Sequence, residues 1–128
     1  MKLLLDTQLL LWVAAEPVRL AQPVRDLIEN PDNEPFFSPA SLWEIAIRAG
    51  TARKDFRVDT AVLRRGLLDN GYGELPITSE HVVAVTGLPA ELKDPFDRIL
   101  VAQSIVERIA LLTSDPFVAR YGELVTGE

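Results

Sequence analysis

The sequence contains no cysteine and a single histidine, His81. The absence of cysteine excludes disulfide bonds, thiolate metal sites and thiol nucleophiles, and it suits a reducing compartment, so we expect a cytoplasmic protein. One histidine cannot supply both the general acid and the general base of a nuclease that works with a histidine pair. A single histidine and no cysteine also argue against a Zn²⁺ site, so a catalytic metal would have to be bound by oxygen ligands.

Long hydrophobic runs are also missing. The N-terminal residues, with Lys2 and the small pair Ala14 and Ala15, loosely resemble a secretory signal, but Asp6 interrupts the apolar stretch. The uninterrupted apolar run that remains, from Leu9 to Ala15, is far shorter than the roughly 20 residues of a membrane-spanning helix. We therefore expect no membrane segment.

Nearly half of the 128 residues are apolar, which is enough for one sizeable core, and we expect a single domain spanning residues 1–128. Strand-like runs alternate with helical patterns, and this alternation predicts a parallel sheet covered by helices on both faces. The predicted strands are Lys2–Leu5, Pro35–Ser38, Glu74–Ile77, Ile109–Thr113 and Glu123–Val125. The predicted helices are Thr7–Ala15, Ala21–Glu29, Pro39–Ala49, Thr60–Asp69, Ser79–Thr86, Phe96–Glu107 and Pro116–Arg120.

Two carboxylates follow predicted strands. Asp6 comes directly after the first strand, and Asp115 comes two residues after Thr113 closes the fourth. In a parallel α/β sheet the active site forms outside the carboxyl ends of the strands, so both acids are candidates for it. Asp115 precedes Pro116, and simple capping of a helix would also explain it. Asp6 is harder to explain structurally, because a carboxylate in an apolar segment is costly unless something pairs with it.

Two further acids lie on predicted helices. Glu44 forms a narrow polar stripe with Ser41 and Arg48 among large apolar residues, although an exposed Glu44–Arg48 pair would give the same pattern. Asp97 comes three residues after the expected cap Asp94, where a carboxylate also favours the helix dipole. Gathered on one rim, such acids would repel one another, and a divalent cation with hard oxygen ligands would hold them together.

The formal net charge of −6 is not evenly distributed. The segment from position 48 to 65 contains six basic residues and only two acids, a local excess of +4 by direct count. This segment predicts a surface that contacts phosphate, and a solvated helix face with its loop is the equal alternative. The candidate RNA-binding residues in it are Arg48, Arg53, Lys54 and Arg57.

Four blocks occur in order along the chain: Leu-Leu-Leu-Asp-Thr, Ala-Ser-Leu-Trp-Glu-Ile-Ala, Asp-Pro-Phe-Asp-Arg-Ile-Leu-Val-Ala-Gln and Leu-Leu-Thr-Ser-Asp. Together they resemble PIN-domain ribonucleases, particularly the VapC-like toxins of type II VapBC toxin–antitoxin systems. The resemblance covers essentially the whole chain. It implies a three-layer α/β/α sandwich with a parallel sheet in the order 3-2-1-4-5.

The same resemblance implies roles for individual residues. The metal-binding and catalytic acids would be Asp6, Glu44, Asp97 and, as a less indispensable fourth, Asp115, with Thr7 and Asp94 as accessory residues. They would bind one or two Mg²⁺ or Mn²⁺ ions in an endoribonuclease that uses a metal-activated water. A homodimer and a small VapB-like antitoxin partner are implied as well. Two positions depart from the family, because Gln8 and Leu92 stand where relatives commonly carry histidine.

Other functions stay open at this point. The chain could be a catalytically weak PIN-fold binding module, or a PIN nuclease of RNA processing that is not a toxin. A phosphoacceptor receiver domain has a similar α/β pattern, but its adjacent acids after the first strand and its late lysine have no counterpart here. Four aromatic residues are candidates for base stacking, although their apolar neighbours favour core packing, and we expect a structural His81. These aromatic residues are Trp12, Phe36, Phe37 and Trp43.

Overall fold

The computed structural model describes residues 1–50, 58–121 and 124–126. Within them the strands form one five-stranded parallel sheet in the order β3-β2-β1-β4-β5, as the resemblance implies. The strands are β1 (Lys2–Leu5), β2 (Glu34–Phe37), β3 (Gly73–Glu74), β4 (Ala110–Thr113) and β5 (Leu124–Thr126). The helices are α1 (Thr7–Ala15), α2 (Gln22–Glu29), α3 (Pro39–Gly50), α4 (Thr60–Asp69), α5 (Ser79–Val85), α6 (Pro95–Glu107) and the short 3₁₀ helices η1 (Pro17–Arg19) and η2 (Val118–Arg120).

Most predicted elements have ends within one residue of the observed ones, and three elements differ by more than that. Of the predicted strand Glu74–Ile77 only Glu74 lies in a strand, the two-residue β3, and Pro76 has no N–H to donate to a neighbouring strand. The predicted helix Pro116–Arg120 is only the 3₁₀ turn η2, a geometry that is common in pieces this short. The helical turn η1 was not predicted.

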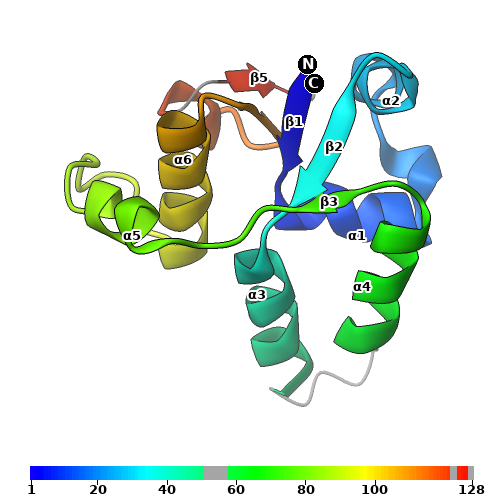
Figure 1. Ribbon diagram of the computed structural model, residues 1–128, viewed down its shortest axis with the longest axis horizontal. Helices are drawn as coiled ribbons and strands as arrows, with labels where there is room; N and C mark the ends of the chain where they lie inside the picture. Colours follow the sequence, from blue (N-terminus) through cyan, green and yellow to red (C-terminus); the bar gives the residue numbers. More distant parts are fainter. Residues whose placement is uncertain (51–57, 122–123, 127–128) are drawn as a thin grey trace.

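Strand β1 lies in the middle of the sheet, and its leucines alternate between the two faces. Leu3 and Leu5 pack in a core cluster with residues of α1, α2 and α4, whereas Leu4 packs with Leu100 and Val101 of α6. All three leucines of β1 are fully buried. Because successive side chains of a strand point to opposite faces, this division produces the predicted three-layer sandwich. Figure 1 shows α1, α2 and α4 on one side of the sheet and α5 and α6 on the other.

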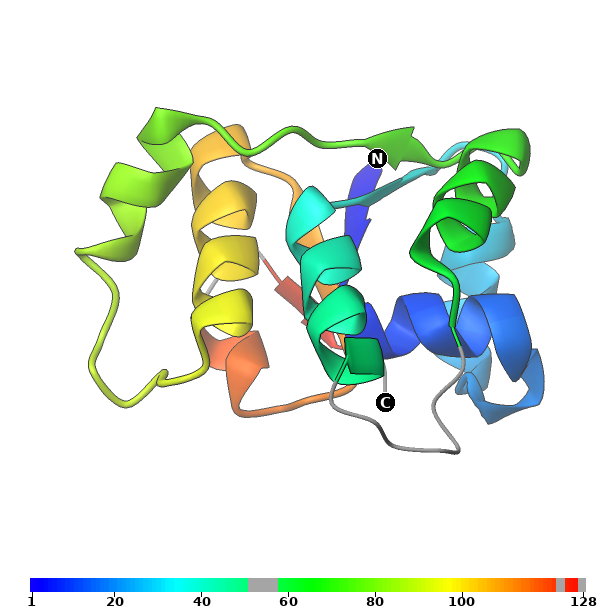
Figure 2. The same ribbon diagram turned by 90° about the horizontal axis from the view of Figure 1, so that it is seen from below.

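The carboxyl ends of the parallel strands share one edge of the sheet. Helices α1 and α3 begin close to the ends of β1 and β2, and α3 lies against α6. The view in Figure 2 shows α3 and α6 running side by side. The ends of β1 and β4 and the helices α3 and α6 therefore lie near one another at this edge. None of the helices in the described ranges is long and apolar enough to cross a membrane.

Candidate active site

Asp6 is buried at the end of β1, where it caps the N-terminus of α1. Its Oδ1 accepts the backbone N–H of Leu9 at 2.9 Å, and its Oδ2 accepts the hydroxyl of Thr113 at 2.6 Å. Burial raises the pKa of Asp6 above its usual value, and these hydrogen bonds to the charged form oppose the shift. The pairing explains how an acid can stand in the apolar N-terminal segment.

Glu44 of α3 and Asp97 of α6 are both half-buried, and the charge of Glu44 acts on Asp97. Burial raises the pKa of Asp97 to about 7, and the negative charges of Asp94, Glu44 and Asp6 add to the shift. Burial also raises the pKa of Glu44, while its hydrogen bond with the Thr7 hydroxyl and the charge of Arg48 act against the increase. Perturbed acids of this kind cluster at functional sites.

One cavity of about 240 Å³ brings the predicted acids together. The acids come from the ends of β1 and β4 and from helices α3 and α6, so the cavity lies at the carboxyl edge of the sheet. It is lined by Asp6, Thr7, Gln8, Glu44, Arg48, Asp97, Ser114 and Asp115. Asp94 is not among these lining residues.

Asp94 caps α6 as the sequence predicted, whereas Asp115 does not cap a helix, because η2 begins after Phe117 and has no side-chain cap bond. Asp115 is exposed, and its Oδ1 accepts the N–H of Phe117 at 2.9 Å. Asp94 caps α6 by accepting the N–H groups of Phe96 and Asp97, at 2.8 and 3.1 Å. Asp115 therefore combines this hydrogen bond in the turn before η2 with a place in the cavity, whereas Asp94 acts on the site through its charge.

The donor set of the cavity suits a hard divalent cation. It offers four carboxylates together with the hydroxyls of Thr7 and Ser114, and all of these are oxygen ligands. In the arrangement described, no three His, Asp or Glu side chains of residues 1–50, 58–121 and 124–126 are close enough to hold a metal ion. The pKa values of Asp6, Glu44 and Asp97 are raised chiefly by burial and further by neighbouring negative charges, and a bound cation would offset both effects.

Thr113 and Ser114 are site residues that the sequence analysis missed. Thr113 is fully buried at the end of β4, and its hydroxyl accepts the N–H of Asp115 at 3.0 Å while it donates to Asp6. The sequence offered one signal for Thr113, because it is a hydroxyl residue at the last position of an apolar strand and lies two residues before Asp115. A threonine there has high strand propensity in any case, so its second role is visible only when β1 and β4 are seen as neighbours.

The two departures from the family pattern lie in different surroundings. Gln8 lines the cavity beside Asp6. Leu92 is 1% exposed and packs in the core cluster that also contains Leu4 and Leu100. Of the two, only Gln8 is placed to touch a substrate in the cavity.

Of the four predicted RNA-binding residues, the structure describes one. Arg48 is exposed and lines the cavity. Arg53, Lys54 and Arg57 lie outside the described residues.

The aromatic residues only partly follow the prediction of core packing. Phe37 is fully buried, and the half-buried Trp12 and Phe36 pack against the core clusters. Trp43 contradicts the prediction, because it is 64% exposed and packs only its ring edge-to-face with Phe96. Of the apolar neighbours of Trp43, Ile45 lies in the core cluster and Leu42 packs against it, whereas Ile47, like Trp43, is exposed.

His81 has the structural role that we expected. The ring is fully buried. Its Nδ1 accepts the N–H of Thr78 at 3.0 Å, and this bond is part of the capping box at the start of α5. The Nε2 atom lies 2.7 Å from a carboxylate oxygen of Glu107, so the ring ties α5 to α6.

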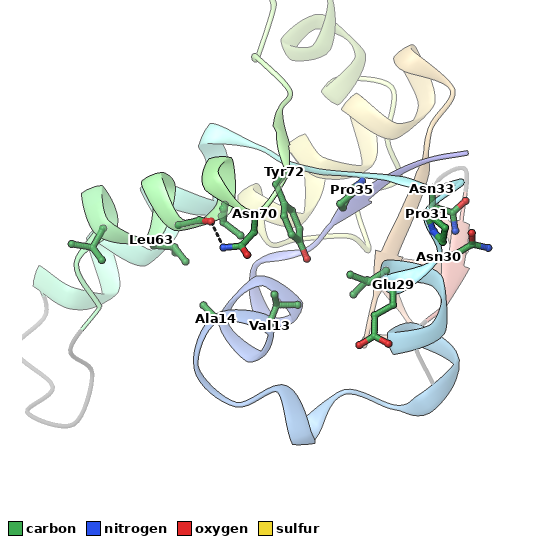
Figure 3. Close-up of a pocket in the computed structure, with 15 residues that line it drawn as sticks. Val13, Ala14, Glu29, Asn30, Pro31, Asn33, Pro35, Leu63, Asn70 and Tyr72 are labelled. Carbon is green, nitrogen blue, oxygen red and sulfur yellow. Dashed lines mark hydrogen bonds between the residues drawn. The ribbon is translucent and has the colours of Figure 1, made fainter.

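A larger cavity of about 720 Å³ lies away from the acids, between α1, α2 and α4 (Figure 3). Its lining mixes apolar residues such as Val13 and Leu63 with three asparagines and a single acid, Glu29. Tyr72 points into it, and its buried hydroxyl has no hydrogen-bond partner among the described residues. Burial raises the pKa of Tyr72 to about 12. With one acid in its lining, this cavity lacks the cluster that metal chemistry requires.

Comparison with known proteins agrees with this fold. The family model described as the PIN domain matches residues 3–124. The chain belongs to the PIN domain family. A comparison with curated proteins found no match.

Solved structures of PIN fold are similar over nearly the whole chain. A chain of VapBC2 from Rickettsia felis, bound to a DNA fragment from its promoter, is 16% identical with a TM-score of 0.70, over 98% of this chain and 97% of that one. A chain of VapBC-1 from nontypeable Haemophilus influenzae is 12% identical with a TM-score of 0.70, over 98% of both chains. A chain of a toxin–antitoxin complex from Klebsiella pneumoniae is 18% identical with a TM-score of 0.61, over 98% of this chain and 97% of that one. At these identities the likeness establishes the fold.

Proposed function

We propose that this PIN-domain protein is a Mg²⁺- or Mn²⁺-dependent endoribonuclease and the toxin of a type II toxin–antitoxin pair. The observation that carries the proposal is the cavity at the carboxyl edge of the sheet, which four acids from distant parts of the chain line together. A hydrolytic metal site needs such a set, because the phosphodiester and the attacking water both have to be bound by a hard cation.

In this proposal Asp6, Glu44 and Asp97 hold one or two ions, and Asp115 is the fourth and less indispensable ligand. Such an ion, when bound, lowers the pKa of a coordinated water and offsets the charge that develops at the scissile phosphate. The protein's own part is to orient the ligands. Thr113 and the N–H of Leu9 fix the two carboxylate oxygens of Asp6, and the Thr7 hydroxyl steadies Glu44.

RNA is proposed as the substrate from the family resemblance, with support from one charged residue. Arg48 lines the cavity one helical turn beyond Glu44, where its guanidinium can contact a phosphate next to the one being cut. The products would carry a 5′-phosphate and a 3′-hydroxyl, as the resemblance implies.

The proposed partner is a small VapB-like antitoxin, and the proposed assembly is a homodimer in the cytoplasm. The three solved neighbours described above are chains of VapBC or toxin–antitoxin complexes, which supports an antitoxin partner. A basic side chain of the antitoxin among the carboxylates would neutralise the cavity in place of a metal.

Cleavage of a structured RNA by the purified protein tests the proposal. We expect cleavage with Mg²⁺ or Mn²⁺, none with EDTA, and none by Asp6→Asn, which can still cap α1. Asp69→Asn, at the exposed end of α4, is a matched control and should cut like the parent. Undiminished cutting by Asp6→Asn would refute the metal mechanism. Binding of Mn²⁺ in calorimetry without any hydrolysis would instead favour a binding module that has lost turnover.

A further inference from the structure

The guanidinium of Arg98, on α6, lies among backbone carbonyls at the end of α5 and in the segment that follows it. Its Nη1 donates to the carbonyl oxygens of Pro89 and Leu92, and its Nη2 donates to those of Val85 and Leu88. The bond to Pro89 is 2.8 Å long and the bond to Val85 is 2.9 Å long. One side chain of α6 therefore holds four points of the chain between α5 and α6.

The hydrogen-bonding needs of this segment explain why an arginine suits the position. The last carbonyls of a helix have no partner within the helix, and the residues from Thr86 to Asp94 lie outside helices and strands. A guanidinium carries several N–H donors in a flat fork and can serve several acceptors at once, whereas the ammonium of lysine is a compact point charge. In the part of the chain that the structure describes, no carboxylate forms an ion pair with Arg98.

The clamped segment ends at the N-terminus of α6, which carries an acid of the cavity. Asp94 is the last residue of the segment, and its Oδ1 accepts the N–H groups of Phe96 and Asp97. The N–H of Arg98 donates to the carbonyl oxygen of Asp94 at 2.9 Å. Its side chain binds the carbonyl of Leu92, a buried core residue two positions before Asp94. The main chain and the side chain of Arg98 together fix the turn from which Asp97 reaches the cavity.

We propose that Arg98 is a positioning residue of the carboxylate cavity, which holds the segment before α6 in place and thereby keeps Asp97 oriented to bind metal. This inference rests on the proposed function, and it adds a residue that touches neither metal nor substrate. Arg98 is not among the described residues that line the cavity, and loop carbonyls engage both of its Nη atoms. Residues that fix the ligands of a metal commonly change its affinity by roughly ten- to hundredfold.

Calorimetry with Mn²⁺ in the absence of RNA is the first test. Arg98→Met keeps a long unbranched side chain but has no N–H to donate, and we expect its affinity for Mn²⁺ to fall by roughly tenfold or more. Arg98→Lys keeps the charge and some of the hydrogen bonding, so its affinity should lie between those of Arg98→Met and the parent.

Arg25 of α2 offers a matched control. Its guanidinium also donates to a loop carbonyl, that of Pro17 at 2.6 Å, but α2 lies on the opposite side of the sheet from α6 (Figure 1). Arg25→Met should therefore lose a comparable contact and still bind Mn²⁺ like the parent.

Amide hydrogen exchange of the metal-free protein gives a readout that does not depend on catalysis. In Arg98→Met, exchange should accelerate at Phe96 and Asp97, whose N–H groups bind Asp94. We expect this acceleration to exceed that at Leu10, whose N–H is bonded at the start of α1, by on the order of tenfold. A general loss of stability would instead accelerate exchange at all three positions alike.

The metal dependence of cleavage separates positioning from the loss of a ligand. The four acids of the cavity all remain in Arg98→Met, so a high concentration of Mn²⁺ should restore most of the RNA cleavage that this variant loses at low Mn²⁺. No concentration of Mn²⁺ should restore cleavage by Asp97→Asn.

The outcomes distinguish this inference from the proposed function. An affinity of Arg98→Met for Mn²⁺ equal to that of the parent would overturn the positioning role, even if the parent cut RNA. Equal acceleration of exchange at Phe96 and Leu10 would also overturn it, because Arg98 would then only stabilise the fold. Weaker Mn²⁺ binding and faster local exchange in Arg98→Met, with a parent that never cuts RNA, would support the positioning role and refute the nuclease. A parent that binds no Mn²⁺ would refute both.

Discussion

The hydroxyl of Thr113 donates a 2.6 Å hydrogen bond to Oδ2 of Asp6, joining residues 107 positions apart in the chain. It is possible because β1 and β4 are neighbours in the sheet, so their carboxyl ends lie together. The same hydroxyl accepts the N–H of Asp115. Thr113 therefore links the first and last acids of the cavity.

Thr113→Val tests this link with a side chain of nearly the same shape. Removing the hydroxyl leaves Oδ2 of Asp6 and the N–H of Asp115 without their partner, and we expect a loss of stability of about 1–3 kcal/mol. If Asp6 binds metal, the affinity for Mn²⁺ should also fall by roughly tenfold or more, as for other residues that orient metal ligands. Calorimetry with Mn²⁺ measures this fall. Thr113→Ser keeps the hydroxyl and should bind Mn²⁺ more like the parent, so equal losses in both variants would contradict the role.

The pKa of Asp97 predicts an unusual pH dependence of stability. In the folded protein it is raised to about 7 from an ordinary value of 3.8, so between these values the folded state holds a proton that the unfolded state has lost. The free energy of unfolding in EDTA should therefore fall as the pH rises through this window, and level off above it. Because Asp97 is only half-buried, solvent screening reduces the expected fall to on the order of 1–2 kcal/mol.

Urea unfolding at about pH 5 and about pH 8 measures this dependence. Asp97→Asn should be more stable than the parent at the higher pH and should show a flatter profile, although it should cut no RNA. Asp69→Asn should keep the parent's profile. Parallel profiles for the parent and Asp97→Asn would show that Asp97 titrates normally in the folded protein.

Two substitutions of Asp94 can separate the effect of its charge from its capping of α6. Asp94→Asn keeps an acceptor for the N–H groups of Phe96 and Asp97 but removes a charge that raises the pKa of Asp97. In this variant we expect the pKa of Asp97 to fall and the stability to change little. The chemical shift of the Asp97 carboxyl carbon, followed by NMR as a function of pH, measures the pKa. Asp94→Ala removes the cap as well and should cost about 1 kcal/mol. An unchanged pKa of Asp97 in both variants would exclude the electrostatic role.

Positions 8 and 92 should respond differently to histidine, the residue that the family resemblance implies at both. Leu92→His places an imidazole in a core position that is 1% exposed, and should cost about 2–4 kcal/mol without raising RNA cleavage. Gln8→His changes a residue that lines the cavity, so it should raise cleavage severalfold and alter stability by no more than about 0.5 kcal/mol. Thermal unfolding and cleavage rates of the two variants provide the comparison. A gain of cleavage in Leu92→His would contradict the buried placement of this residue.

The local patterns of the sequence were sufficient for much of the fold. Apolar runs and proline or glycine boundaries indicated the alternation of strands and helices, and the strand order followed from the family resemblance. The prediction failed where local signals were weak, as in the two-residue strand β3, because pairing with β2 decides whether such a segment is a strand.

For the site, the sequence by itself determined which acids were available and which strand ends or helix starts carried them, because caps and periodicity act over a few residues. Only the tertiary structure decided that Asp6, Glu44, Asp97 and Asp115 line one cavity, that Thr113 bonds Asp6, that Leu92 is buried and that Trp43 is exposed. These features depend on which faces of β1, β4, α3 and α6 meet. Such contacts join residues far apart in the chain, and the local pattern around each residue carries little information about them.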